Sequence, residues 1–165
     1  MPDLLQTREY ARAVTAADPV LPAGPQDTGP RGDAHSPAAD RGERRPELAV
    51  VIGEAVLHQI VGGTGIMQAQ LARLAEMSGT YPQIAIQVLP FAGGAHPAGG
   101  SGPLSILRFA GAPSLGVVHL PGPCGGIILD SPSDVASHAR AFTLLSASAL
   151  TPAATTQLLR DMAVR

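Results

Sequence analysis

Short apolar runs, separated by turns rich in glycine and proline, dominate the second and larger part of the chain. Residues 48–52 form a run with several β-branched side chains, which predicts a buried strand. Apolar residues alternate through 84–89, so a second strand is expected there. Three further runs are joined by short Gly/Pro connections that favour antiparallel pairing of the strands. These runs are residues 104–109, 115–120 and 127–129.

Apolar residues at helical spacing precede, interrupt and follow these strands. Residues 4–17 predict a short helix capped by Asp3. Residues 54–60 predict one helical turn, and the apolar face at residues 67–78 predicts a longer helix that ends at Gly79. Two start signals near the C-terminus, each a capping hydroxyl followed by proline, predict two more helices. They are Ser131-Pro132 and Thr151-Pro152.

The expected core is aliphatic, because aromatic residues make up only 3% of the chain. Its few large anchors are expected to be Phe91, Phe109 and Phe142. The periodicity predicts which side chains the two C-terminal helices bury. These are Val135, Ala139, Phe142, Leu145 and Ala149 on the first helix, and Leu158, Leu159 and Met162 on the second.

The order of these elements predicts a mixed α/β fold. We expect a mostly antiparallel sheet of about five strands, with one inserted helix and two C-terminal helices. Three regions follow: an N-terminal helix at 1–17, a linker at 18–46 and an α/β domain at 47–165. The linker is rich in proline and glycine and nearly lacks apolar side chains, so we expect it to be disordered or extended.

Charge and cysteine content narrow the classes of function. The formal net charge is −2, and all eleven Lys+Arg residues are arginines scattered along the chain, which argues against a basic nucleic-acid-binding surface. The single cysteine excludes an internal disulfide and a multi-cysteine zinc site. No apolar run approaches the roughly 20 residues that span a bilayer. The N-terminus lacks the apolar centre of a signal peptide, so we expect a cytoplasmic protein without a membrane anchor.

Two segments contain residues that suit a functional site, and each also has a simpler structural explanation. Residues 62–65 are glycine-rich and precede a helix, so their N–H groups suit a phosphate. They lack the lysine of a P-loop, however, and a turn with a helix cap explains them better. His119 and Cys124 suit a nucleophilic cysteine site, with an oxyanion held by the two following glycines. A strand-end histidine and a packed thiol explain the same residues.

The remaining polar residues do not form a metal pattern, and we expect neither a metal nor a cofactor. Glu54 lies between two apolar segments, which predicts a partly buried carboxylate paired with Arg73 or Arg108. The loop at 92–102 is long for a compact domain, as binding loops often are, and His96 is its main polar side chain. The residues considered as metal ligands are Glu54, His58, His96, His119, Asp130 and His138.

Several blocks of sequence together resemble the domain of unknown function that follows a helix-turn-helix in many actinobacterial Xre-type, WhiJ-like transcriptional regulators. Leu4-Leu5-Gln6-Thr7 with Tyr10-Ala11 is similar to the G-L-L-Q-T-x-x-Y-A motif at the start of that domain, with Asp3 in place of the glycine. The other blocks run from residue 49 to the C-terminus. They are Glu54-Ala55 with Leu57, Gly62-Gly63, Met67 with Gln70-Leu71, Gln87-Val88-Leu89-Pro90-Phe91, Gly94-Ala95-His96, and Ala149-Leu150-Thr151-Pro152.

The resemblance implies a cytoplasmic regulatory domain linked to developmental and secondary-metabolite control. It also implies a partner, because such domains are often encoded beside a small protein. This chain contains no helix-turn-helix, so we expect no direct DNA binding. Residues 18–46 replace a helix of the family, and Pro121-Gly122 stand where the family tends to place a carboxylate.

We therefore predict a non-catalytic domain that binds a protein partner or a small-molecule effector and that can form a homodimer. The alternative is a small enzyme that uses Cys124 with His119, or Glu54. No catalytic residue is expected under the first hypothesis. The candidate ligand or partner contacts are Glu54, Gln70, Gln87, Phe91 and His96.

Overall fold

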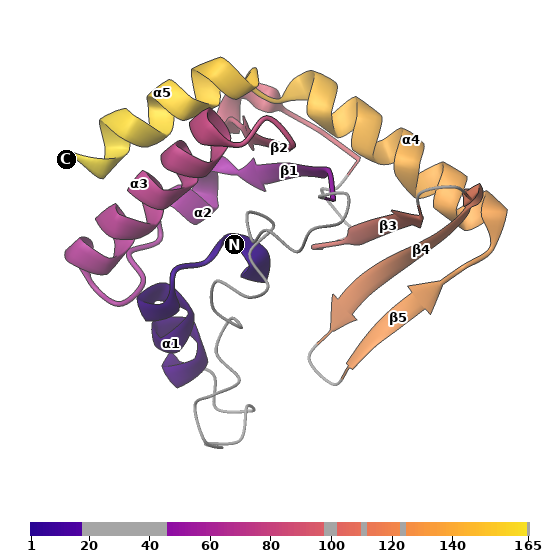
Figure 1. Cartoon of the computed structure of the whole chain (residues 1–165), viewed down its shortest axis with the longest axis horizontal. Coiled ribbons are helices and arrows are strands. Elements are labelled where there is room, and N and C mark those ends of the chain that lie inside the picture. Colours follow the sequence, from indigo (N-terminus) through magenta and orange to yellow (C-terminus); the bar gives the residue numbers. More distant parts are fainter. Residues whose placement is uncertain (18–45, 98–101, 110–111, 123–124, 165) are drawn as a thin grey trace. The chain divides into compact units, whose positions relative to one another are not determined.

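The computed structural model describes residues 1–17, 46–97, 102–109, 112–122 and 125–164. They form two compact units, a first unit of Met1–Phe91 with Leu150–Arg165 and a second unit of Ala92–Ala149. The predicted mixed α/β class is confirmed, and Figure 1 shows its helices and strands. The five strands that the structure describes are divided between a parallel pair and an antiparallel sheet of three. Almost all of the expected linker lies outside the described residues.

A parallel strand pair forms the centre of the first unit. Strands β1 (Leu48–Gly53) and β2 (Ile84–Leu89) are joined by α2 (Glu54–His58) and α3 (Thr64–Thr80), close to the predicted bounds. The helical crossover explains the parallel pairing, because only a long connection returns the chain to the same end of a sheet. Helix α5 (Pro152–Ala163) packs against α3 and β2.

One face of this strand pair carries the core. Val50 lies opposite Ile86 and Ile52 opposite Val88, so these four side chains share a face. All four are buried, together with Leu74 of α3 and Leu159 of α5. Of the residues that alternate with them, Leu89 is also buried and the others are less buried. The core is therefore aliphatic, as the composition predicts.

The edge of β2 that faces away from β1 is covered by the start of α5. The Leu150 N–H donates to the Val88 carbonyl at 2.8 Å, and the Val88 N–H donates to the hydroxyl of buried Thr155 at 3.0 Å. The Gln87 amide donates to the Leu150 carbonyl at 2.9 Å. The first two bonds satisfy backbone groups of Val88 that an open edge strand would leave free for another chain.

The N-terminal segment is divided, where one continuous helix was expected. Residues Asp3–Leu5 form a 3-10 turn, η1, and α1 begins only at Arg8 and runs to Ala17. The Thr7 hydroxyl accepts the Tyr10 N–H at 3.2 Å, so Thr7 caps α1 in place of Asp3. The prediction of a helix from Leu4 was wrong, because the backbone is extended at Gln6 and Gln70 bonds to the residues on either side of it.

The second unit is an antiparallel sheet with one helix packed on it (Figure 1). A 3-10 turn, η3 (Phe91–Gly93), spans the boundary between the units, and β3 (Ser105–Phe109), β4 (Ala112–Gly122), β5 (Gly125–Leu129) and α4 (Pro132–Ser148) follow. The antiparallel pairing in the order β3-β4-β5 confirms the prediction from the short turns. Ser131 caps α4 by accepting the Asp134 N–H at 3.2 Å, as its sequence signal predicts.

The packing of α4 is shallower than its periodicity suggests. A Cβ placed on Gly116 of β4 would lie 2.9 Å from Val135, so the helix approaches the sheet closely at this glycine. Even so, no described side chain of α4 is fully buried. The prediction that α4 buries five side chains was therefore wrong in degree. Phe91 and Phe109 are also exposed, so neither is the core anchor that was expected.

Tyr10 gives the first unit an alkaline pH dependence. Burial raises the pKa of Tyr10 above its usual value. A group whose pKa is higher in the folded chain contributes stability that is complete below the unfolded value, about 10 for tyrosine, and that is lost as pH rises through the folded pKa. We therefore expect the free energy of unfolding to fall above about pH 10. Tyr10→Phe should remove most of that fall in urea titrations at several alkaline pH values.

Few other side chains titrate in the same alkaline range, because the chain has no lysine and only two tyrosines. Tyr81→Phe is the matched control and should keep the alkaline loss. An equal loss of stability in Tyr10→Phe and in the unaltered chain would show that another group is responsible.

Candidate functional site

The candidate site lies where the two parallel strands end. Glu54 follows β1 directly, and Phe91 follows β2 after Pro90. Because the strands are parallel, both residues lie at the carboxyl ends of the pair. Ligands commonly bind at this end of the sheet in α/β folds. The Glu54 Oε2 atom accepts the Phe91 N–H at 2.7 Å, a bond between residues 37 positions apart.

His58 joins these two residues from α2. Helix α2 begins at Glu54, so His58 lies one turn later on the same face. Its ring stacks on Phe91, with 5.8 Å between the ring centroids and 27° between the planes. Its Nε2 atom lies 3.6 Å from the Glu54 Oε1 atom, which is longer than a hydrogen bond. We call these three residues the Glu54–His58–Phe91 cluster.

The cluster presents two aromatic rings to solvent beside a partly shielded carboxylate. Phe91 is 66% exposed, and the His58 and Glu54 side chains are 55% and 23% exposed. The predicted partial burial of Glu54 is confirmed. Such a surface can bind an apolar or cationic group, because aromatic faces attract both. No sequence pattern predicts the His58–Phe91 contact, since the two residues are far apart in the chain.

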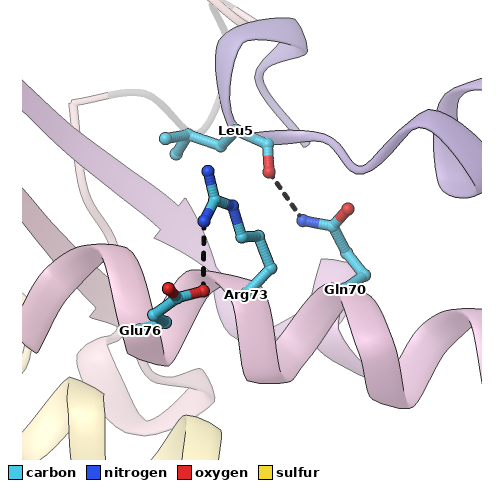
Figure 2. Close-up of polar contacts among 4 residues, drawn as sticks. All are labelled: Leu5, Gln70, Arg73 and Glu76. Carbon is cyan, nitrogen blue, oxygen red and sulfur yellow. Dashed lines mark hydrogen bonds and ion pairs between the residues drawn. The ribbon is translucent and has the colours of Figure 1, made fainter. Parts of the chain in front are cut away.

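Gln70, another candidate contact, lies inside the first unit. It is fully buried on α3, and Figure 2 shows its amide directed at the Leu5 carbonyl, to which it donates at 2.8 Å. Its Oε1 atom accepts the Thr7 N–H at 2.6 Å. Both halves of the amide thus bind backbone of the N-terminal segment. Gln70 has a structural role here and presents no surface to a ligand.

The last two candidates are Gln87 and His96. Gln87 is half-buried on β2 and holds the Leu150 carbonyl, as described above. His96 belongs to the second unit and is half-buried, and its Nδ1 atom is buried without a hydrogen-bond partner among the described residues. Of the five candidate residues, Glu54 and Phe91 are therefore the pair that a described hydrogen bond joins.

The expected ion pair of Glu54 with an arginine of α3 was wrong. Arg73 pairs with Glu76 on its own helix at 3.0 Å, as Figure 2 shows. Arg108, the other arginine considered, is an exposed residue of β3 in the second unit. Glu54 has the Phe91 N–H and the His58 ring as its neighbours instead.

The glycine-rich segment before α3 is a turn. Gly62 and Gly63 have φ angles of 68° and 96°, in the region that favours glycine. A Cβ on Gly62 would lie 2.8 Å from Ala13 of α1, so this glycine also lets the N-terminal helix approach. Both observations give the glycines a structural reason that needs no phosphate.

The structure describes only one of the two residues in the hypothesis of a His119–Cys124 site. His119 is half-buried on β4, and a Cβ on Gly126 would collide with its imidazole, so that glycine makes room for the ring. Cys124 lies outside the described residues. Within the described part of the chain, no three His, Cys, Asp or Glu residues are grouped as a metal site would require. Among the same residues, no helix is long and apolar enough to cross a membrane.

Comparison with known proteins identifies one family. The family model of the domain of unknown function DUF5753 matches residues 1–161, nearly the whole chain. Neither the curated proteins nor the solved structures contain a match. The match includes the N-terminal segment, so the residues that dock on α3 are part of the family's domain.

Proposed function

This chain belongs to the family of domains of unknown function DUF5753, and from that premise we propose that it is a non-catalytic regulatory domain. It acts by binding a protein partner, with the Glu54–His58–Phe91 cluster as its contact surface. The observation that carries the proposal is Phe91, a large aromatic side chain that is exposed and yet held in place.

Phe91 has the properties of an interface anchor. Its backbone N–H is bonded to Glu54, so the backbone that carries the ring has little freedom left to lose on binding. Aromatic side chains on rigid elements are frequent hot spots of protein interfaces. Exposed apolar groups also gain free energy when a partner removes them from water.

The positions of the polar groups favour binding over catalysis. The Glu54 Oε2 atom accepts a backbone N–H at 2.7 Å, and the His58 ring lies against Phe91. The bond to Glu54 fixes the backbone that carries the Phe91 ring. A general acid or base would instead need to direct its reactive atom at a substrate. An enzyme that uses Glu54 gains no support from this arrangement, and Cys124 lies outside the described residues.

The regulatory part of the proposal comes from the resemblance to Xre-type, WhiJ-like regulators. In this view the domain is the effector side of a cytoplasmic transcriptional regulator, and the DNA reader is a separate helix-turn-helix. A ligand can shift such a regulator only if it binds one state better than the other. The partner is the small protein encoded beside the gene, and a small effector or a second copy of the chain can act through the same surface.

Calorimetric titration with the purified product of the adjacent small gene tests the proposal. Phe91→Ala should weaken binding about tenfold or more, the effect of losing a hot-spot side chain. Phe109→Ala is the matched control, because Phe109 is a similarly exposed phenylalanine of the second unit. If Phe109→Ala weakens binding and Phe91→Ala does not, the contact surface has been assigned to the wrong unit.

A further inference from the structure

We infer that the Glu54–His58–Phe91 cluster binds a guanidinium group, and that His58 occupies the place of this group in the free protein. The inference rests on the proposed function, because it names the chemistry that the same surface recognises. It follows from the charge of the cluster, from the geometry of His58 and from the remaining acceptor sites of Glu54.

The charge of the cluster selects a cation. Glu54 is its carboxylate, and the faces of aromatic rings carry negative electrostatic potential, so both components attract positive charge. An anion would approach that carboxylate with only the His58 imidazole to attract it. A purely apolar group would leave the Glu54 carboxylate without a new partner. A cation beside an aromatic face satisfies both components at once.

His58 already makes, weakly, the two contacts that a guanidinium would make. It is a flat ring stacked on Phe91, and the Nε2 atom at its edge lies 3.6 Å from the Glu54 Oε1 atom. A guanidinium is also flat, donates from its edge and is always charged. The His58–Glu54 distance exceeds that of a hydrogen bond, and the His58 side chain is 55% exposed. Displacing His58 therefore costs little.

Glu54 keeps acceptor sites for the incoming group. A carboxylate has about four lone-pair sites, and the Phe91 N–H occupies one of them on Oε2. The same bond fixes the carboxylate beside the backbone of the residue whose ring would carry the cation. A planar guanidinium can stack on that ring and direct N–H groups at Glu54, whereas an ammonium group lacks the flat face.

The test is a titration of the full chain with the blocked tripeptide N-acetyl-Gly-Arg-Gly-amide, followed by the ring proton signals of His58 and Phe91 in NMR spectra. We expect saturable shifts with a Kd on the order of 10 mM, as one ion pair and one cation–π contact allow. The lysine analogue should bind more weakly. A parallel titration with free L-arginine distinguishes the two sources of a guanidinium group. Tighter binding of the blocked peptide points to an arginine of a protein partner, and tighter binding of free arginine points to a small effector.

Three variants separate the roles of the cluster. Glu54→Gln keeps an acceptor for the Phe91 N–H, so the site should stay intact while peptide binding weakens about fivefold. Phe91→Leu, which keeps an apolar side chain without a π face, should weaken it about threefold. His58→Ala should leave binding as tight or make it tighter, because the competing ring is gone.

The inference is overturned if no saturable shift occurs, if the lysine analogue binds equally well, or if His58→Ala abolishes binding. It fails separately from the proposed function. Loss of partner binding in Phe91→Ala, with no response to the arginine peptide, would remove only the guanidinium chemistry. A peptide response, with partner binding unaffected by Phe91→Ala, would keep that chemistry and reject the protein contact.

Discussion

Leu5→Ala is expected to lower the free energy of unfolding of the first unit by about 2–5 kcal/mol, the usual effect of removing a buried leucine side chain. Leu4→Ala should cost less than about 1 kcal/mol, because a largely exposed leucine loses little on truncation. Leu5 is 1% exposed and belongs to the core cluster with Leu74 and Leu159, whereas Leu4 is 52% exposed. The two leucines are neighbours in sequence, so each is a matched control for the other.

Tyrosine fluorescence during urea unfolding measures this difference. The chain has two tyrosines and no tryptophan, and both Tyr10 and Tyr81 belong to the first unit. The signal therefore reports on that unit alone. Comparable losses for the two variants would mean that the N-terminal segment is not docked as described, since only docking distinguishes the two side chains.

Local signals in the sequence predict the local structure well. Ser131 and Thr151 cap α4 and α5 by accepting N–H groups three residues later, as the Ser-Pro and Thr-Pro pairs indicate. The alternation through 84–89 gives β2 the predicted bounds. These features depend on residues close to one another in the chain, and such short-range preferences can be read from the sequence directly.

Burial depth could not be predicted in the same way. Periodicity identifies the face that α4 turns inward, but it does not say how much structure covers that face. The sheet below α4 has only three strands, and the helix stays partly exposed. For the same reason, Phe91 and Phe109 were expected in the core on hydrophobicity alone. Their exposure is more informative than burial would have been, because large exposed apolar groups often mark contact surfaces.

The sequence also left open what the polar residues of the resembling blocks do. Glu54, Gln70 and Gln87 each bind backbone far away in the chain, at separations of 37, 63 and 63 positions. No spacing rule predicts such partners, because they meet only after the chain has folded. The blocks that identify the family therefore include residues that hold its elements together. Within the described residues, the cluster around Phe91 combines such a bond with an exposed aromatic surface.

Gln70→Leu is the second change with a large expected effect, because it leaves two backbone groups without partners. Gln70 is fully buried, and it supplies the donor for the Leu5 carbonyl and the acceptor for the Thr7 N–H. Each unsatisfied buried group costs about 1–3 kcal/mol, so the two together cost about 2–6 kcal/mol. The N-terminal segment can escape part of this cost by undocking into water. Its docking free energy therefore sets the upper limit of the loss.

Hydrogen exchange locates the effect. In Gln70→Leu, the amides of residues 5–11 should lose most of their protection, while those of β2 should change little. Gln157→Leu is the control, because this glutamine is exposed on α5 and bonds to Asp161 on its own helix. Gln70→Glu keeps the acceptor for the Thr7 N–H but sets a buried charge against the Leu5 carbonyl, so it should lose at least as much protection. Unchanged exchange of the Thr7 amide in both variants would show that the Gln70 bonds do not hold the segment in solution.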